Sequence, residues 1–547
     1  MEMELKKQNY SLVLAIIFSI GLLKLLIGLY LPLLADEAYW WMFSRNLDFS
    51  YYDQGPGVAL HIRLFTSLFG ETKLALKLAA VITTSLGNFL VYKIAKELGL
   101  STNQALIALC LSILLPGFFL GSFVIVHDSS FIPLWIAAMY FALRFIKRRE
   151  NYSLLGFFIC LGLGALSKHT MIFFVFAALL WLLITPKEWK ILKNPFLYLG
   201  LFLTAMVVSP ILIWNYKHNW AGFEMVLGLH YAGGVNKSSS TILYIVGQLI
   251  AFSPLFYSAF WILPFKKGWK NFLEFWKDPA WCFTLINAWI LPLSFLAIST
   301  KTSVQANWVF PSFPAMVVII SANLPDFSKK SKAIFWGIVA CLPAVLFILF
   351  ILFFHQIRGI LKLDERMEFA HGNFGYKEAI VGIENFRESI DPNAGLLANT
   401  YQDAARASWY LPGKPYVPSL NVLKKNQFTF WEQPQAGKNY VVFHVSDYLC
   451  KKTDFLLFYL DYACDEVVEK PEAEIRQNGR FLKRYQVWYC KNLGEHWNKF
   501  FVNRRYDEVL KEIVSNLKEF DKLKAKHKVS QSTIMKLIAD FNRDVCE

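Results

Sequence analysis

The feature that most limits what this chain can fold into is a succession of about eleven strongly apolar segments, most of them near the roughly 20 residues that cross a bilayer. They cover residues 11–33, 74–94, 105–125, 129–146, 153–167, 170–185, 196–213, 241–264, 280–299, 309–323 and 333–355. Hydrophobic residues make up 55% of the 547 residues, and aromatic residues 17%, which is more apolar than a soluble domain. We therefore predict a polytopic α-helical membrane protein.

Basic residues fall mainly between the apolar segments. Four connections are rich in Lys and Arg: residues 147–149, 187–193, 266–270 and 329–332. The positive-inside rule places all four, and the N-terminus, in the cytoplasm. The net charge of +15 then reflects topology and contact with anionic lipid, and nucleic acid is not expected as a partner. The first segment shows no cleavage site and is expected to remain as an anchor in an inner (cytoplasmic) membrane.

Counting the spans in order places five polar clusters at the outer, periplasmic ends of the apolar segments. The clusters are Asp36-Glu37 with the loop that follows to Gly70; His127-Asp128; Lys168-His169; Trp214 to His218; and Lys301 with Gln305, Asn307 and Trp308. Unrelated polar residues would scatter over both membrane faces, whereas acids, imidazoles and amides on one face indicate a polar site.

The first outer loop is patterned rather than featureless. Residues 38–47 and 58–69 are expected to form two helices in the headgroup plane, separated by a break at residues 51–57. An aromatic belt would explain Trp40 and Trp41. An aromatic belt does not explain the presence of Arg45, Asp53 or Arg63.

The outer clusters contain both carboxylates, which can take up a proton, and cations, which can stabilise the negative charge of a phosphate. For the phosphate we expect Lys168 and Lys301, supported by Arg45, Arg63 and His169. The alternative for each cation is ordinary snorkelling to lipid headgroups.

The order of these motifs resembles that of membrane glycosyltransferases of the GT-C superfamily, in the branch of protein O-mannosyltransferases and lipid A aminoarabinose transferases. The motifs are Asp36 to Trp40 followed by Tyr51-Tyr52-Asp53 and Pro56; His127-Asp128 to Trp135; Leu166 to His169; Ser209-Pro210 through Trp214-Asn215 to Phe223; and Asn307-Trp308 with Pro311 and Pro314. The resemblance covers nearly all of residues 10–490, and each motif alone is weak.

The resemblance implies an inverting transferase with a polyprenyl-phosphate-linked sugar as donor and a glycolipid, such as lipid A, or a protein as acceptor. It makes Asp36, beside Glu37, the catalytic carboxylate, and Asp128 a second acid. Relatives often carry His-Pro or Lys-Pro after the loop acid, whereas this chain has Gln54-Gly55-Pro56. A phosphate contact from residue 54 is therefore in doubt.

The remaining candidates line the substrate cavity or hold a metal. The cavity candidates are Tyr52, Asp53, Trp214, Asn215, Asn307 and Trp308. Some relatives hold a divalent metal with the acid at the Asp53 position and an outer-loop histidine, for which His218 and His230 are candidates here. No spacing in the chain forms a self-sufficient zinc motif, so a cofactor requirement stays open.

Hydropathy falls after residue 355. Three regions follow from this: a transmembrane glycosyltransferase domain at 1–355, a periplasmic α/β domain at 356–490 and a Lys-rich helical tail at 491–547. In the α/β domain we expect helices at 376–389 and 401–411 and strands at 395–400, 439–445 and 484–489. Cys450 and Cys464 form the favoured disulfide, although spacing does not fix connectivity.

Two other classes stay open. A secondary transporter or lipid-linked-substrate flippase would also have many spans, but repeated halves and mid-bilayer polar residues are not evident. A non-catalytic envelope assembly or binding protein would use Asp36 only structurally.

Overall fold

The computed structural model describes residues 2–228, 237–265, 269–324, 371–420, 425–446, 453–477, 480–495 and 497. The chain divides into two compact units. Met1–Leu31 and Phe43–Leu363 form the membrane unit, and Pro32–Met42 with Asp364–Glu547 form the C-terminal unit.

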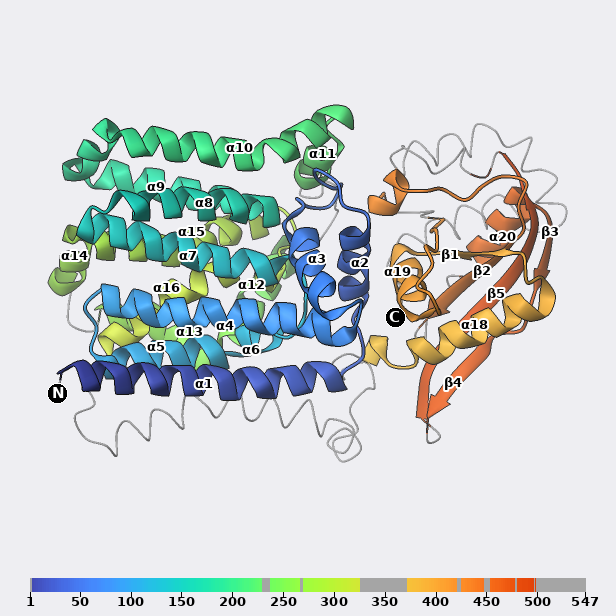
Figure 1. Ribbon diagram of the computed structural model, residues 1–547, viewed down its shortest axis with the longest axis horizontal. Helices are drawn as coiled ribbons and strands as arrows, with labels where there is room; N and C mark the ends of the chain where they lie inside the picture. The colour runs from blue at the N-terminus through green and yellow to red at the C-terminus, as the bar shows by residue number, and fades with distance from the viewer. Residues whose placement is uncertain are drawn as a thin grey trace. The chain divides into compact units, whose positions relative to one another are not determined.

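All the secondary-structure elements of the membrane unit, within its described residues, are helices. Its elements are α1 (Glu2–Tyr30), the end of α2 (Ala35–Arg45), α3 (Gly57–Phe69), α4 (Lys73–Glu97), α5 (Thr102–Leu114), α6 (Pro116–Gly121), α7 (His127–Arg148), α8 (Asn151–Ser167), η1 (His169–Met171), α9 (Ile172–Ile184), η2 (Pro186–Lys193), α10 (Pro195–Lys217), α11 (Ala221–Gly228), α12 (Lys237–Phe252), α13 (Pro254–Ile262), η3 (Leu263–Phe265), α14 (Trp269–Lys277), α15 (Pro279–Ser299), η4 (Ala306–Ser312) and α16 (Phe313–Asn323). Figure 1 shows α10, α8, α7, α4 and α1 as a series of roughly parallel long helices.

The predicted membrane architecture is confirmed, but the number of about eleven spans is not. Among the described residues, six helices are long and apolar enough to cross a bilayer, or eight if each of two bent pairs is one span. Two further predicted spans correspond to shorter helices, because α5 has 13 residues and α8 has 17. The predicted span at 333–355 lies outside the described residues.

The predicted span at 105–125 is interrupted between α5 and α6. A buried lysine of the membrane unit hydrogen-bonds to the end of α5. Pro116 begins α6 immediately after α5, and its ring lacks the N–H that would continue the helix. Lys24 of α1 is 3% exposed and donates from Nζ to the Ile113 carbonyl oxygen at 3.2 Å. Helix-end carbonyls lack partners within their own helix, so the buried lysine satisfies one of them.

Both predicted helices of the first outer loop are present. α2 begins at Ala35, three residues earlier than expected, so that Asp36 and Glu37 fall in its first turn. α3 begins at Gly57, one residue early, and buries Val58 and Ile62 on its inner side.

The C-terminal unit is an α/β domain built on one sheet. Its elements are η6 (His371–Asn373), α18 (Tyr376–Ile390), β1 (Gly395–Ala398), α19 (Tyr401–Tyr410), η7 (Gln427–Phe430), β2 (Tyr440–Ser446), α20 (Thr453–Ala463), β3 (Cys464–Glu469), β4 (Ala473–Gln477) and β5 (Arg480–Leu493). The strand order is β1-β2-β5-β3, and β4 pairs with β5 outside this path. β1 and β2 are parallel, whereas β5 runs antiparallel to β2, β3 and β4. α20, β3 and β4 were not predicted from the sequence.

The favoured disulfide between Cys450 and Cys464 is wrong. Cys464 is bonded to Cys490, and their Cα atoms lie 5.5 Å apart. The reason is the length of β5, which has 14 residues instead of the expected six and so carries Cys490 alongside β3. Cys450 lies outside the described residues.

The start of α2 packs within the C-terminal unit. The Tyr39 hydroxyl accepts a hydrogen bond from the Gln427 backbone N–H at 3.0 Å. The Trp41 ring meets Trp409 edge-on with ring centroids 4.9 Å apart. The division therefore differs from the predicted boundary at residue 355, since residues 32–42 join the C-terminal unit. Most of the predicted tail at 491–547 lies outside the described residues.

A buried acid ties three segments of this unit together. Asp403, 1% exposed, accepts hydrogen bonds from the Tyr376 hydroxyl and from His444 Nδ1, the latter at 3.2 Å. Burial alone would raise the pKa of Asp403, but the hydrogen bond and charge of His444, with Tyr376 and Arg406, hold this pKa below its usual value.

Candidate active site

Three of the predicted site residues meet in one buried cluster within the membrane unit. Lys168 Nζ lies 2.7 Å from Asp128 Oδ1 and forms an ion pair with it. The Asn307 side-chain amide donates to Asp128 Oδ2 at 2.8 Å, and His127 Nε2 lies 3.7 Å from the same oxygen. Asp128 and Lys168 are 8% and 4% exposed. A single carboxylate is thus held by a cation and an amide from separate segments.

The local structure explains why this pair forms where it does. Asp128 lies in the first turn of α7, and Lys168 is the residue that ends α8. The partial charges of helix ends favour an acid at the start of a helix and a cation at its finish. η4 supplies Asn307. The antiparallel packing of α7 on α8 brings the two charged ends together.

The end of α8 is fixed by the glycines of the first outer loop. A Cβ added to Gly55 would lie 2.2 Å from the Leu166 carbonyl oxygen, and one added to Gly57 would lie 2.6 Å from Ser167 Cα. Only residues without a side chain allow this approach. The Gly55-Pro56-Gly57 run therefore seats the loop against the residues immediately before Lys168.

Gln54 contacts His169 through its side chain. Its side-chain oxygen lies 3.2 Å from His169 Nδ1. The His169 ring also meets Phe223 edge-on at 6.0 Å. Gln54 thus provides a polar partner for His169, which was not predicted from the sequence.

The Trp214 to His218 motif mainly organises the end of α10. Trp214 Nε1 donates to Asp48 Oδ2 at 2.9 Å, and the His218 ring stacks on Trp214 with centroids 4.0 Å apart. The Asn215 side-chain oxygen accepts from the Phe223 N–H at 3.1 Å and so caps α11. Asp48 was not predicted; its position just before the conformational break was the only available signal.

The acids of the motif that opens the first loop differ in environment. Asp36 is exposed, whereas the Glu37 side chain is buried and accepts a hydrogen bond from the Leu34 backbone N–H at 3.1 Å. This Glu37 bond reaches back to the residue before the helix, as in one half of a capping box. The structure thus gives Glu37 a part in starting α2, and it leaves Asp36 the more accessible carboxylate.

The other predicted cations are more exposed than Lys168. Arg45 Nε lies 3.5 Å from Glu71 Oε1 at the surface of the membrane unit. Arg63 is exposed on α3. Lys301, also exposed, makes no ion pair with any residue in the described part of the chain. The buried Asp128 cluster therefore includes only one of the predicted lysines.

The remaining cavity candidates lie in the first loop and in η4. Burial raises the pKa of Tyr52 to about 12, and the charges of Asp53 and Glu224 act in the same direction. The phenol therefore stays a hydrogen-bond donor at neutral pH. The Trp308 ring packs beside Phe295 with centroids 5.4 Å apart.

Metal ligation by Asp53 and His218 remains a prediction, and His230 lies outside the described residues. His218 Nδ1 lies 2.8 Å from the Trp214 carbonyl oxygen. Within the ranges that the structure describes, no group of three or more His, Cys, Asp or Glu residues could hold a metal ion.

Comparisons with known proteins agree on one class. The family model for dolichyl-phosphate-mannose-protein mannosyltransferases matches residues 53–214. A lipid A galacturonosyltransferase, RgtD of Rhizobium johnstonii, is 28% identical over 194 residues, which are 34% of this chain and 38% of RgtD. The chain thus aligns with well under half of that relative's length.

The fold extends the likeness to nearly the whole chain. Crystal structures of ArnT from Cupriavidus metallidurans, apo and bound to undecaprenyl phosphate, match with a TM-score of 0.58. Each match covers 87% of this chain and 97% of ArnT at 14% identity. The chain therefore has the fold of ArnT and a partial sequence match to mannosyltransferases, and both agree with the resemblance to the GT-C superfamily.

Proposed function

We propose that this protein is an inverting glycosyltransferase that moves a sugar from a polyprenyl phosphate to a hydroxyl of an envelope glycolipid. A glycolipid of the lipid A type is the favoured acceptor, because RgtD is named for lipid A. Undecaprenyl phosphate is the favoured carrier, because ArnT binds it in a structure of the same fold. We also propose that the site faces the periplasm, since the four basic connections favour the opposite side.

The observation that carries the proposal is the Asp128–Lys168–Asn307 cluster. Charged side chains buried in a membrane protein are energetically costly and mark functional sites. A lysine held by a carboxylate can exchange that partner for a phosphate, because both are anionic oxygen groups. Asp128 therefore keeps the ammonium in place until the donor phosphate arrives.

The reaction needs no covalent enzyme intermediate. In the proposed step the acceptor hydroxyl attacks C1 of the sugar and gives its proton to Asp36, and the bond from C1 to the phosphate oxygen breaks. The polyprenyl phosphate leaves with the bonding electrons, and Lys168 stabilises the added charge. One displacement inverts the anomeric configuration. Asp36 is assigned from its place in the motif and its exposure.

The test is turnover by the purified full chain with a radiolabelled polyprenyl-phosphate sugar and lipid A. Asp36→Asn should abolish transfer while donor binding persists, and Glu378→Gln, an exposed acid on α18, should behave as the wild type. Near-normal turnover by Asp36→Asn would remove this residue from the base role. Counterflow in liposomes without turnover would instead favour a transporter.

Donor recognition is tested with two lysines. Lys168→Ala should raise the apparent KM for the donor much more than Lys301→Ala, because only Lys168 belongs to the buried cluster. Equal effects of the two changes would contradict a special phosphate contact at residue 168.

Topology is tested with single cysteines and an impermeant maleimide in intact cells. Cysteine at Glu71 or Asn393 should be labelled from outside, and cysteine at Lys187 only after permeabilisation. The reverse pattern would overturn the proposed orientation.

A further inference from the structure

The connection between α9 and α10 contains an unusual helical segment. η2, with the sequence PKEWKILK, runs as a 3₁₀-helix over eight residues. Such helices rarely exceed three or four residues. η2 turns by 115° from α9, so that it does not continue the path of that helix. An ordinary extension of the membrane span would not show this geometry.

A 3₁₀-helix has three residues per turn, so η2 presents three rows of side chains. Lys187, Lys190 and Lys193 are spaced by three and share one row. A rise of about 2.0 Å per residue separates successive members by about 6 Å along the axis. All three lysines are exposed, and none forms an ion pair with a residue in the described ranges.

The second row faces the protein and removes the only acid of the segment from solvent. Glu188 is 6% exposed, and its carboxylate pairs with Arg149, whose Nη1 lies 2.6 Å from Oε2. Ile191, half-buried, packs against the hydrophobic core. The Arg149 pair neutralises Glu188, so the charge that η2 shows outward comes from its lysines.

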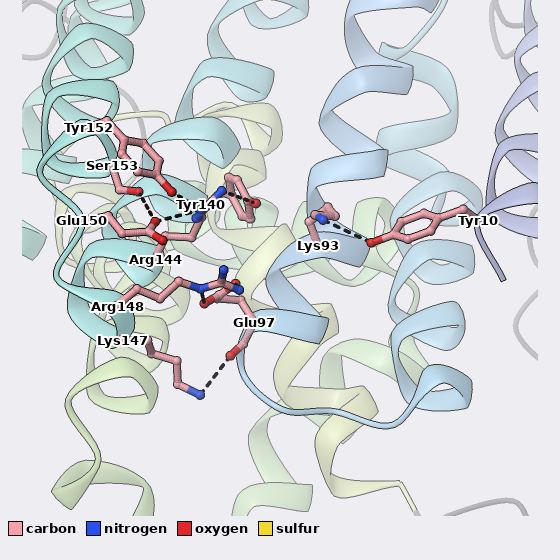
Figure 2. A network of polar contacts seen from close by, with 10 residues as sticks. All are labelled: Tyr10, Lys93, Glu97, Tyr140, Arg144, Lys147, Arg148, Glu150, Tyr152 and Ser153. Carbon is pink, nitrogen blue, oxygen red and sulfur yellow. Dashed lines mark hydrogen bonds and ion pairs between the residues drawn. The ribbon is translucent and has the colours of Figure 1, made fainter. Parts of the chain in front are cut away.

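Arginine residues pair with the acidic residues at the neighbouring helix ends in the same way. Figure 2 shows Arg148 of α7 paired with Glu97 of α4, with Nη2 2.7 Å from Oε2, and Arg144 paired with Glu150 at 2.8 Å. These acids are therefore not available to the η2 lysines.

The third row is apolar and exposed. Trp189 is 52% and Leu192 44% exposed. Trp189 Nε1 donates to the Leu182 carbonyl oxygen at 2.9 Å, so the indole folds back toward the last turn of α9. Leu183 in that turn is 70% exposed. A tryptophan with a satisfied N–H beside lipid-facing leucines is typical of a membrane interface.

We propose that η2 is a binding site for anionic phospholipid, with the phosphates of the headgroups on the Lys187–Lys190–Lys193 row and the acyl region against Trp189 and Leu192. The adjoining apolar row favours lipid over a soluble phosphate compound, since only lipid carries both features. The inference is independent of the reaction proposed above.

The test uses the full-length protein in detergent and measures lipid binding by native mass spectrometry. The probes are phosphatidylglycerol, phosphatidylcholine and inorganic phosphate. The wild type should bind phosphatidylglycerol at least tenfold more tightly than phosphatidylcholine. The triple variant K187Q/K190Q/K193Q should lose this preference, because each lysine near an anionic surface contributes about fivefold. Raising the salt concentration should reduce the preference in the wild type.

Two further variants separate the rows and control for net charge. W189A/L192A should weaken binding of both lipids without changing their ratio. K377Q/K438Q/K491Q removes three exposed lysines of the C-terminal unit and should change neither. An unchanged ratio in K187Q/K190Q/K193Q would overturn the proposal. Competition by inorganic phosphate at the same concentration as phosphatidylglycerol would also overturn it, because it would indicate a site for free phosphate.

Discussion

The ion pair between Asp128 and Lys168 predicts strong energetic coupling between the two positions. The pair is buried and hydrogen-bonded at 2.7 Å. Removal of one partner of such a pair costs about 3–5 kcal/mol, because the other charge is left buried without compensation. Lys168→Met leaves the Asp128 carboxylate with the Asn307 amide, and Asp128→Asn leaves the ammonium unpaired. We expect each single change to destabilise the protein in this range.

The double variant Asp128→Asn/Lys168→Met removes both charges. It should be only about as destabilised as either single variant, or less, which implies a coupling energy of about 3 kcal/mol or more. The assay is unfolding in mixed micelles by added SDS, followed by tryptophan fluorescence and compared for the four proteins. Lys301→Met, at an exposed lysine, serves as the control and should change stability by less than about 0.5 kcal/mol.

The result that would refute this reasoning is additivity. If the double variant lost the sum of the two single losses within about 0.5 kcal/mol, the two side chains would not interact, and the geometry of the cluster would be wrong. Turnover alone could not show this, because each of the three variants is expected to impair donor use whether or not the two side chains interact.

Three more changes test other parts of the structure. Gly57→Ala should lower stability by about 1–3 kcal/mol and reduce turnover, because its Cβ would overlap Ser167, whereas Gly121→Ala, with open space around it, should be tolerated in a thermal unfolding assay. Asp403→Asn should reduce the loss of stability of the C-terminal unit at acid pH. The lowered pKa of Asp403 stabilises the unit above about pH 4, and this contribution is lost as the pH falls through that pKa. Calorimetry at pH 3 to 7 checks this. Cys490→Ser should lower the free energy of unfolding by roughly 3.5 kcal/mol, the value that the loop-entropy relation gives for a 26-residue separation. The measurement is a drop in melting temperature, which dithiothreitol should reproduce in the wild type.

Hydropathy and charge placement predicted much of the membrane unit. The helices of the first outer loop were expected within three residues at their starts, and Asp128, Lys168 and Asn307 were expected at one face. These predictions succeed because burial in lipid requires long apolar runs, and because Lys and Arg gather in the connections on one side of the membrane. The roles of the three residues in a reaction remain predictions.

The missed features depend on contacts between distant residues. Lys24 appears in the sequence only as an interruption of an apolar run, and its partner at Ile113 is 89 residues away. β3 and β4 carry charged residues at most of their exposed positions, so hydropathy gave no sign of strands. Because these two strands were missing, nothing placed Cys490 next to Cys464.

The fit between the first outer loop and the end of α8 has a consequence for how this protein can change over time. Leu166 and Ser167 leave no room for a side chain at residues 55 and 57, although more than a hundred positions separate the two segments. Among descendants of a common ancestor, these four sites should accept replacements in concert, and an insertion in either segment should be rare.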